Sequence, residues 1–307
     1  MRINLTDTNA GAIAAELVRG RRRAGSPAMG MVLTLIVVVD EKQADDALAA
    51  AEEASKEHPA RILGVIIGSR QPASQVDAEI RIGAGTTGET VLLWLRGEVT
   101  GHSESVVTPL LLADSPVVVW WPSRAPDDPA AEPLGALAQR RITDAAGAPR
   151  QKQQAMSTQC RHYSPGNTDL AWTRITGWRA MLAAALDQHP AKVTAASVRA
   201  ERVSPSADLL AAWLTARLRV PVERNTSRGP GITQVVMRTG DGEIRIERPD
   251  GVLASLTLPG QPDRPVALKR RSVAELLAEE LRRLDPDEIY EQTVASMVKI
   301  EKQKAKD

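Results

Sequence analysis

The chain has 307 residues, which at about 100 to 200 residues per domain favours two globular units. Lysine and arginine (39) nearly cancel aspartate and glutamate (38), so the whole molecule has no field that would gather nucleic acid or an anionic membrane. A single cysteine, Cys160, excludes an internal disulfide framework, and no apolar stretch approaches the roughly 18 residues of a membrane helix. We therefore expect a cytoplasmic protein with no nucleic-acid or membrane partner.

Strands and helices alternate in the first part of the chain. Residues 31–39 are dense in β-branched side chains, which predicts a buried strand, and Ala44, Ala47, Leu48 and Ala51 then recur at helical spacing. The same patterns predict strands at 61–68, 76–82, 90–95 and 116–121 and helices at 103–113 and 130–138. Residues 1–144, with a proline-rich extension from 122, are therefore predicted to form an N-terminal α/β sheet domain.

The second part follows a different pattern. Residues 145–168 are polar, which predicts a linker before a C-terminal domain over 169–307. Helices are predicted at 170–186 and 207–218, a strand at 193–203, and then a β-meander whose first turn is Asp241-Gly242. Asp285, Pro286 and Glu288 resemble the start of a last helix. This domain is predicted to be α+β with an antiparallel β-meander.

The run from Gly83 to Gly88 matches the dinucleotide motif G-x-G-x-x-G. Its glycines could admit a pyrophosphate at a helix N-terminus, but a strand is predicted to follow, and the run comes after the third strand rather than the first. A flexible hairpin is the favoured interpretation. Gly83, Gly85 and Gly88 remain weak cofactor candidates, and no cofactor is expected.

Residues 101–105 nearly copy a nucleophile elbow, G-x-S-x-G. The plainer interpretation is a helix N-terminus with Ser103 as its cap and Glu104 favoured by the helix dipole. Cys160 and His162 are close in sequence, but zinc needs about four ligands. We expect no catalytic residue and no metal site, and hence no enzyme.

Basic runs occur at two places in the sequence. The side chains of these runs could bind phosphate groups of a nucleic acid: Arg19 with 21–23, and Lys269 with 270–271. Runs of charge are usually solvated faces, which is the interpretation we favour here.

Trp120 and Trp121 end an apolar strand, at the carboxyl edge where α/β sheets place ligands or partners. Adjacent side chains on a strand point to opposite faces. The two tryptophans could therefore form part of a binding surface or cover packed helices, and the sequence leaves both interpretations open.

The predicted helix over 170–186 has one face expected to pack in the core and flanking residues that could contact a partner. One face carries Ala171, Ile175, Trp178, Leu182 and Leu186 and is expected in the core. Asp169 is expected as an N-cap or first-turn acid. Trp172, Arg174 and Arg179 lie on the flanks and are hypothesised to anchor a protein partner, because tryptophan and arginine are favoured interface residues. An internal salt bridge is the alternative.

Three stretches resemble one family: 29–40 (MGMVLTLIVVVD), 113–122 (ADSPVVVWWP) and, most specifically, 166–179 (GNTDLAWTRITGWR). They are similar to the signatures of the glucose-6-phosphate dehydrogenase assembly protein family, OpcA. The resemblance implies a non-catalytic partner that binds glucose-6-phosphate dehydrogenase, promotes its oligomer and raises its activity in the oxidative pentose phosphate pathway. Such a factor would act allosterically, by binding the active form more tightly.

The alternative function is a nucleotide- or sugar-phosphate-binding enzyme or sensor, with a site near the glycine run at 83–88 and Trp120 and Trp121.

Two positions depart from the family pattern. Relatives under redox control use cysteines, whereas Cys160 alone cannot form an intramolecular disulfide. Asn167 stands where the family pattern leads us to expect an acid.

Overall fold

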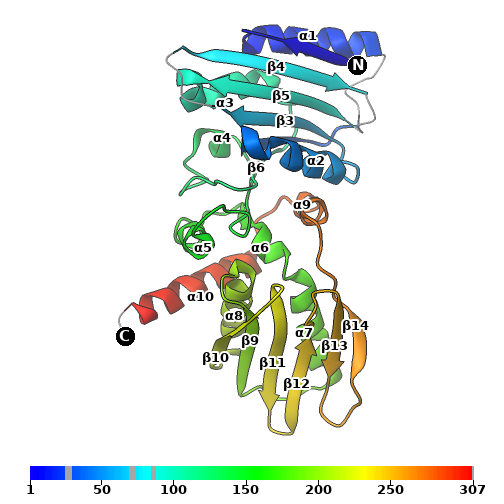
Figure 1. The fold of residues 1–307 in the computed structure, drawn as a ribbon, viewed down its shortest axis with the longest axis vertical. Helices are drawn as coiled ribbons and strands as arrows, with labels where there is room; N and C mark the ends of the chain where they lie inside the picture. Colours follow the sequence, from blue (N-terminus) through cyan, green and yellow to red (C-terminus); the bar gives the residue numbers. More distant parts are fainter. Residues whose placement is uncertain (25–29, 69–72, 84–87, 306–307) are drawn as a thin grey trace. The chain divides into compact units, whose positions relative to one another are not determined.

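The computed structural model describes residues 1–24, 30–68, 73–83 and 88–305 (Figure 1). By its internal contacts the chain divides into two compact units, Met1–Thr143 with Val273–Pro286, and Asp144–Ser272 with Asp287–Asp307. This division differs from the expected one in two respects. The segment 145–168 is part of the second unit, and 273–286 returns to the first.

The first unit is built on a mixed sheet. Its strands are β1 (Arg2–Leu5), β2 (Leu33–Asp40), β3 (Ala60–Ile67), β4 (Gln75–Ile82), β5 (Glu89–Arg96), β6 (Val117–Trp121) and β7 (Arg140–Thr143). They lie in the order β1-β4-β5-β3-β2-β6-β7. The five from β5 to β7 run parallel, and β4 is antiparallel to both its neighbours. The apolar runs of β2 and β3 are buried on both faces, as parallel strands require. The predicted α/β class is confirmed.

The helices of this unit are α1 (Ala10–Ala24), α2 (Ala44–Ala54), α3 (Ser103–Val107), α4 (Pro133–Ala136) and α9 (Val273–Leu281). The predicted apolar face of α2 is confirmed, because Ala44, Ala47, Leu48 and Ala51 are all buried. The helix expected over 103–113 is shorter. It gives way to a 3-10 turn at Thr108–Leu110, where Pro109 has no N–H to continue the α-helical ladder.

Ion pairs hold the returning segment 273–286 in the first unit. The buried side chains of Arg140 and Glu280 pair at 2.5 Å, and Arg140 Nη1 also donates to the carbonyl of Asp285 at 3.0 Å. On the surface, Arg282 pairs at 2.7 Å with Glu57, which lies in the turn after α2. The first unit is therefore completed by residues far along the chain.

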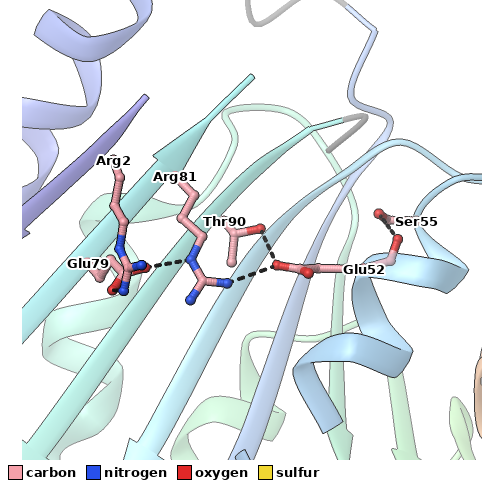
Figure 2. A network of polar contacts seen from close by, with 6 residues as sticks. All are labelled: Arg2, Glu52, Ser55, Glu79, Arg81 and Thr90. Carbon is pink, nitrogen blue, oxygen red and sulfur yellow. Dashed lines mark hydrogen bonds and ion pairs between the residues drawn. The ribbon is translucent and has the colours of Figure 1, made fainter. Parts of the chain in front are cut away.

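A polar network crosses the sheet of the first unit (Figure 2). The carboxylate of Glu79 on β4 lies between Arg2 and Arg81, and Arg81 and Thr90 both donate to Glu52 of α2 at 3.4 Å. Burial alone would raise the pKa of Glu79, but hydrogen bonds from Arg81 and Arg2 outweigh it, so the pKa is lowered. The network thus ties β1, β4, β5 and α2 together.

The second unit is built on another mixed sheet. Its strands are β9 (Ala195–Glu201), β10 (Val222–Ser227), β11 (Ile232–Thr239), β12 (Gly242–Glu247), β13 (Leu253–Thr257) and β14 (Arg264–Ala267), in the order β10-β9-β11-β12-β13-β14. Only β10 and β9 pair in parallel, and β11 to β14 form an antiparallel meander. The predicted α+β class with a β-meander is confirmed.

Helices and one short strand complete this unit: α5 (Lys152–Arg161), β8 (Asn167–Asp169), α6 (Leu170–Thr173), α7 (Thr176–Gln188), α8 (Pro205–Leu218) and α10 (Glu288–Lys304). The expected linker therefore contains a helix, α5, which buries Met156 and Cys160 in the core. The cap of α10 is Asp287 rather than Asp285, because the Asp287 carboxylate accepts the N–H groups of Ile289 and Tyr290. No helix in the described ranges is long and apolar enough to cross a membrane.

Candidate functional site

The sequence signature 166–179 begins with a buried acid. Asp169 follows β8 as the N-cap of α6, and its Oδ1 accepts the N–H of Ala171 at 2.8 Å. Its Oδ2 accepts the N–H of Ala145 at 2.9 Å. The carboxylate is completely buried and joins the start of α6 to the segment before α5. Asp169 therefore has a structural role as a helix cap. The sequence indicated this role, because an acidic residue directly precedes an apolar helix.

The helix expected over 170–186 is broken into α6 and α7. The N–H of Ile175 bonds the carbonyl of Trp172 at 3.1 Å, a tight 3-10 turn that ends α6. An unbroken helix would give the carbonyl of Thr173 to the N–H of Gly177, but here that carbonyl accepts from the guanidinium of Arg271. The expected core face survives the break: Ala171, Ile175, Trp178 and Leu182 are buried, and Leu186 is partly buried against the same core.

Trp172 lies in the interior, not on an open flank. Its side chain is 1% exposed, and its Nε1–H donates to Oδ2 of Asp287 at 2.8 Å. The ring of Tyr290 lies 5.5 Å away, and the guanidinium of Arg179 lies 3.6 Å from the ring centroid. The expectation that Trp172 is free to anchor a partner is corrected, because α10, more than a hundred residues later, covers it.

Arg174 makes an internal salt bridge. Its Nη1 and Nη2 each donate to an oxygen of Asp144 at 2.7 Å, and the arginine side chain is 26% exposed. Burial alone would lower the pKa of Arg174, but the charge and hydrogen bonds of Asp144 outweigh it and raise the pKa. The alternative left open by the sequence, an internal ion pair, is what the structure contains.

Trp178 packs in the core at 1% exposure, with the guanidinium of Arg248 at 5.0 Å from its ring. Trp178 and Arg174 both line a cavity of about 240 Å³ beside the first residues of α8. Basic side chains surround this cavity: Lys152, Arg174, Arg248, Lys269, Arg270 and Arg271. The sequence showed only the run 269–271, because Lys152, Arg174 and Arg248 come from three other segments that folding brings to the cavity.

Trp120 and Trp121 are core residues. They are 0% and 2% exposed, so neither side chain opens onto a binding surface. The interpretation that both cover packed elements is the one the structure supports. The alternative site near these tryptophans is corrected accordingly.

The glycine run connects β4 to β5, which pair antiparallel up to Ile82 and Glu89. Gly83 has a positive φ of 63°, and a Cβ on Gly88 would lie 2.1 Å from the carbonyl oxygen of Ala60. Both glycines therefore have backbone reasons to be glycine. Gly85, the third weak cofactor candidate, lies outside the described residues.

The elbow-like stretch forms a helix start. The N-cap position of α3 is His102, and Ser103 is the first helical residue, so the expected role of Ser103 as the cap is corrected. Ser105 Oγ donates to the carbonyl of His102 at 2.7 Å. The hydroxyl of Ser105 therefore makes a local contact at the helix start.

Cys160 is a core residue rather than a linker thiol. Its Sγ lies 3.6 Å from Sδ of Met297, and burial, followed by the charge of Asp169, raises the pKa of the thiol. Within the described ranges no group of three or more His, Cys, Asp or Glu side chains could hold a metal ion.

Fold and site together define a two-unit protein, an α/β unit joined to an α+β unit whose signature segment is built into the core beside a basic cavity. Residues 51–160 match the model of a glucose-6-phosphate dehydrogenase subunit N-terminal domain, and residues 165–294 match that of the subunit's C-terminal domain. The chain therefore belongs to the glucose-6-phosphate dehydrogenase assembly family, OpcA.

Other comparisons are distant. No curated protein matches the chain in sequence. An oxidoreductase from Sinorhizobium meliloti is 9% identical with a TM-score of 0.43, over 88% of this chain and 90% of that one. An oxidoreductase from Pseudomonas syringae is 10% identical with a TM-score of 0.37, over 90% of each chain. TM-scores this low support no inference about function.

Proposed function

We propose that this chain is a non-catalytic assembly and activation factor that binds glucose-6-phosphate dehydrogenase and promotes its active oligomer. One observation carries the proposal. Matches to two domains, each named for a glucose-6-phosphate dehydrogenase subunit, together extend over most of the chain and fall in both units. The proposed setting is the oxidative pentose phosphate pathway in the cytoplasm.

The factor would act by shifting a population. It can favour the active oligomer only by as much as it binds that state more tightly than the inactive one. Moving an equilibrium from 1:99 to 99:1 requires about 10⁴-fold tighter binding to the favoured state, or about 5.5 kcal/mol. A smaller preference would still raise activity measurably.

Burial guides the choice of proposed contact residues. Of the side chains hypothesised to meet the partner, Trp120, Trp121 and Trp172 are buried, whereas Arg174 and Arg179 are partly exposed. We retain these two arginines as proposed contacts. Of these tryptophans, Trp172 would affect the partner by holding Arg179 in place, since the guanidinium of Arg179 lies over its ring.

The direct test measures activity with purified components. The chain alone is expected to form no NADPH from glucose 6-phosphate and NADP⁺. Adding it to the dehydrogenase from the same host is expected to raise the specific activity until a fixed molar ratio is reached. Turnover by the chain alone, or no change in the dehydrogenase at any ratio, would contradict the proposal.

A second test concerns the contact. Arg179→Ala is expected to weaken dehydrogenase binding tenfold or more, at least about 1.4 kcal/mol, while the chain stays folded. Arg199→Ala is the matched control, since Arg199 is an exposed arginine on β9. Equal binding by both variants would place the interface elsewhere.

A further inference from the structure

The cavity beside α8 has more positive than negative charge in its walls. The acidic residue that lines it is Glu201, whose Oε1 accepts the N–H of Gly231 at 3.1 Å. Among the basic residues, Arg174 is compensated by Asp144. Lys152 and Arg270 have no ion-pair partner in the described part of the chain. The cavity therefore carries uncompensated positive charge.

Arg248 is the most informative member of the cluster. It is 6% exposed, and its Nη1 and Nη2 donate only to backbone carbonyls, those of Leu268 at 2.7 Å and Ile232 at 3.3 Å. Its Nε has no hydrogen-bond partner within the described residues. A buried cation without a paired anion is costly, so proteins seldom keep one without a use.

The electrostatics of Arg248 agree with this geometry. Burial, followed by the nearby charge of Arg270, lowers the pKa of Arg248 to about 10. The guanidinium is still protonated at neutral pH. The charge of Asp250 acts in the opposite direction but only partly offsets these two effects. An anion in the cavity would add further negative charge close to Arg248.

The first turn of α8 contributes to the same cavity. Ser204 is the N-cap of this helix, and the hydroxyl of Ser204 accepts the N–H of Ala207 at 3.4 Å. Pro205 and Ser206, the first two residues of this helix, also line the cavity. A helix N-terminus of this length favours a bound anion.

We propose that this cavity binds a small anion carrying a phosphate group, of the size of a phosphate monoester. Its volume of about 240 Å³ lies just below the roughly 300 to 1,000 Å³ of drug-sized ligand pockets. Arginine forks and a helix N-terminus are the groups that proteins use to hold a phosphate dianion. The site is distinct from the glycine run at 83–88, and it does not depend on the proposed partner.

The test uses the full chain without any dehydrogenase. Isothermal titration at constant ionic strength would compare inorganic phosphate, glycerol 3-phosphate and glucose 6-phosphate, with glycerol and glucose as uncharged controls. We expect saturable binding of at least one phosphate compound and none of the uncharged ones. Tightest binding by inorganic phosphate would identify the free ion as the ligand, and tightest binding by an ester would identify a phosphorylated metabolite.

Variants locate the site. Arg270→Glu reverses an exposed charge at the cavity and is expected to weaken binding tenfold or more, whereas Arg199→Glu makes the same charge change on β9, outside the cavity wall. Lys152→Glu is a second, independent variant, because Lys152 also lines the cavity but comes from a different segment of the chain. It is expected to weaken binding as well. Absence of binding by all three phosphate compounds, or equal loss in Arg270→Glu and Arg199→Glu, would overturn the proposal. Neither result bears on dehydrogenase assembly, which is measured separately.

Discussion

The indole of Trp172 and the carboxylate of Asp287 form the joint between α6 and α10. Asp287 caps α10 through Oδ1, which accepts the N–H groups of Ile289 at 2.9 Å and Tyr290 at 3.0 Å. Its Oδ2 accepts Nε1–H of Trp172 at 2.8 Å. One carboxylate thus stabilises a helix start and a buried tryptophan together. Replacing each partner, singly and together, measures that coupling.

The expected magnitudes follow from these contacts. Losing an N-cap costs about 1 kcal/mol, and losing a hydrogen bond to a charged group costs about 1.5 to 3 kcal/mol, so Asp287→Ala should cost about 2.5 to 4 kcal/mol. Trp172→Phe loses the same hydrogen bond and some packing, for about 2 to 4 kcal/mol. Because the bond is counted in both, the cost of the double variant should fall short of the sum of the single costs by about 1.5 to 3 kcal/mol.

Urea unfolding followed by circular dichroism would measure all four proteins. The control cycle combines Asp287→Ala with Trp94→Phe, because Trp94 lies on β5 in the first unit. That pair should be additive within about 0.5 kcal/mol. A Trp172 cycle as additive as the control would refute the account of this joint, and Trp172→Phe with unchanged stability would show that the indole is not buried as described.

Three further outcomes test the structure at separate places. Cys160 should react with a thiol reagent such as DTNB only after unfolding, because its thiol is buried and its pKa is raised; fast labelling of the native chain would contradict this. The pKa of Glu79 is lowered below 4.5 in the folded state, so the unfolded chain binds more protons between the two values. Its stabilising effect is complete above the unfolded pKa and is lost as pH falls through the folded pKa. Glu79→Gln should weaken the dependence of the urea midpoint on pH below about pH 5, and an unchanged dependence would refute the network. Gly88→Ala should destabilise by about 1 to 3 kcal/mol through contact with the carbonyl of Ala60, whereas Gly101→Ala meets nothing within 4 Å; equal melting temperatures would contradict the packing at Gly88.

Local periodicity predicted where helices and strands lie better than it predicted which distant residues pack against them. The narrow apolar face of α2 and the buried strands β2 and β3 follow from residues a few positions apart, and each lies where its pattern indicates. The break between α6 and α7 could not be predicted in this way. It depends on the guanidinium of Arg271, which takes the carbonyl of Thr173 and comes from a segment almost a hundred residues later.

The candidate site shows the same limit. Spacing placed Trp172 on a flank of its helix, but burial was decided by α10, which no local pattern connects to it. The basic cavity was equally hidden in the sequence, because Arg248 is a single basic residue just after β12 and only the run 269–271 looked unusual. The family signature 166–179 was visible in the sequence, whereas its role in packing was not.

The central claim is that this chain binds glucose-6-phosphate dehydrogenase and favours its active oligomer. Sedimentation velocity of the dehydrogenase, with and without an equimolar amount of this chain, tests it most directly when activity is read from the same samples. The account predicts a co-sedimenting complex, a shift of the dehydrogenase toward its larger species, and a matching rise in activity. Independent sedimentation of the two proteins, with an unchanged distribution of the dehydrogenase, would contradict it.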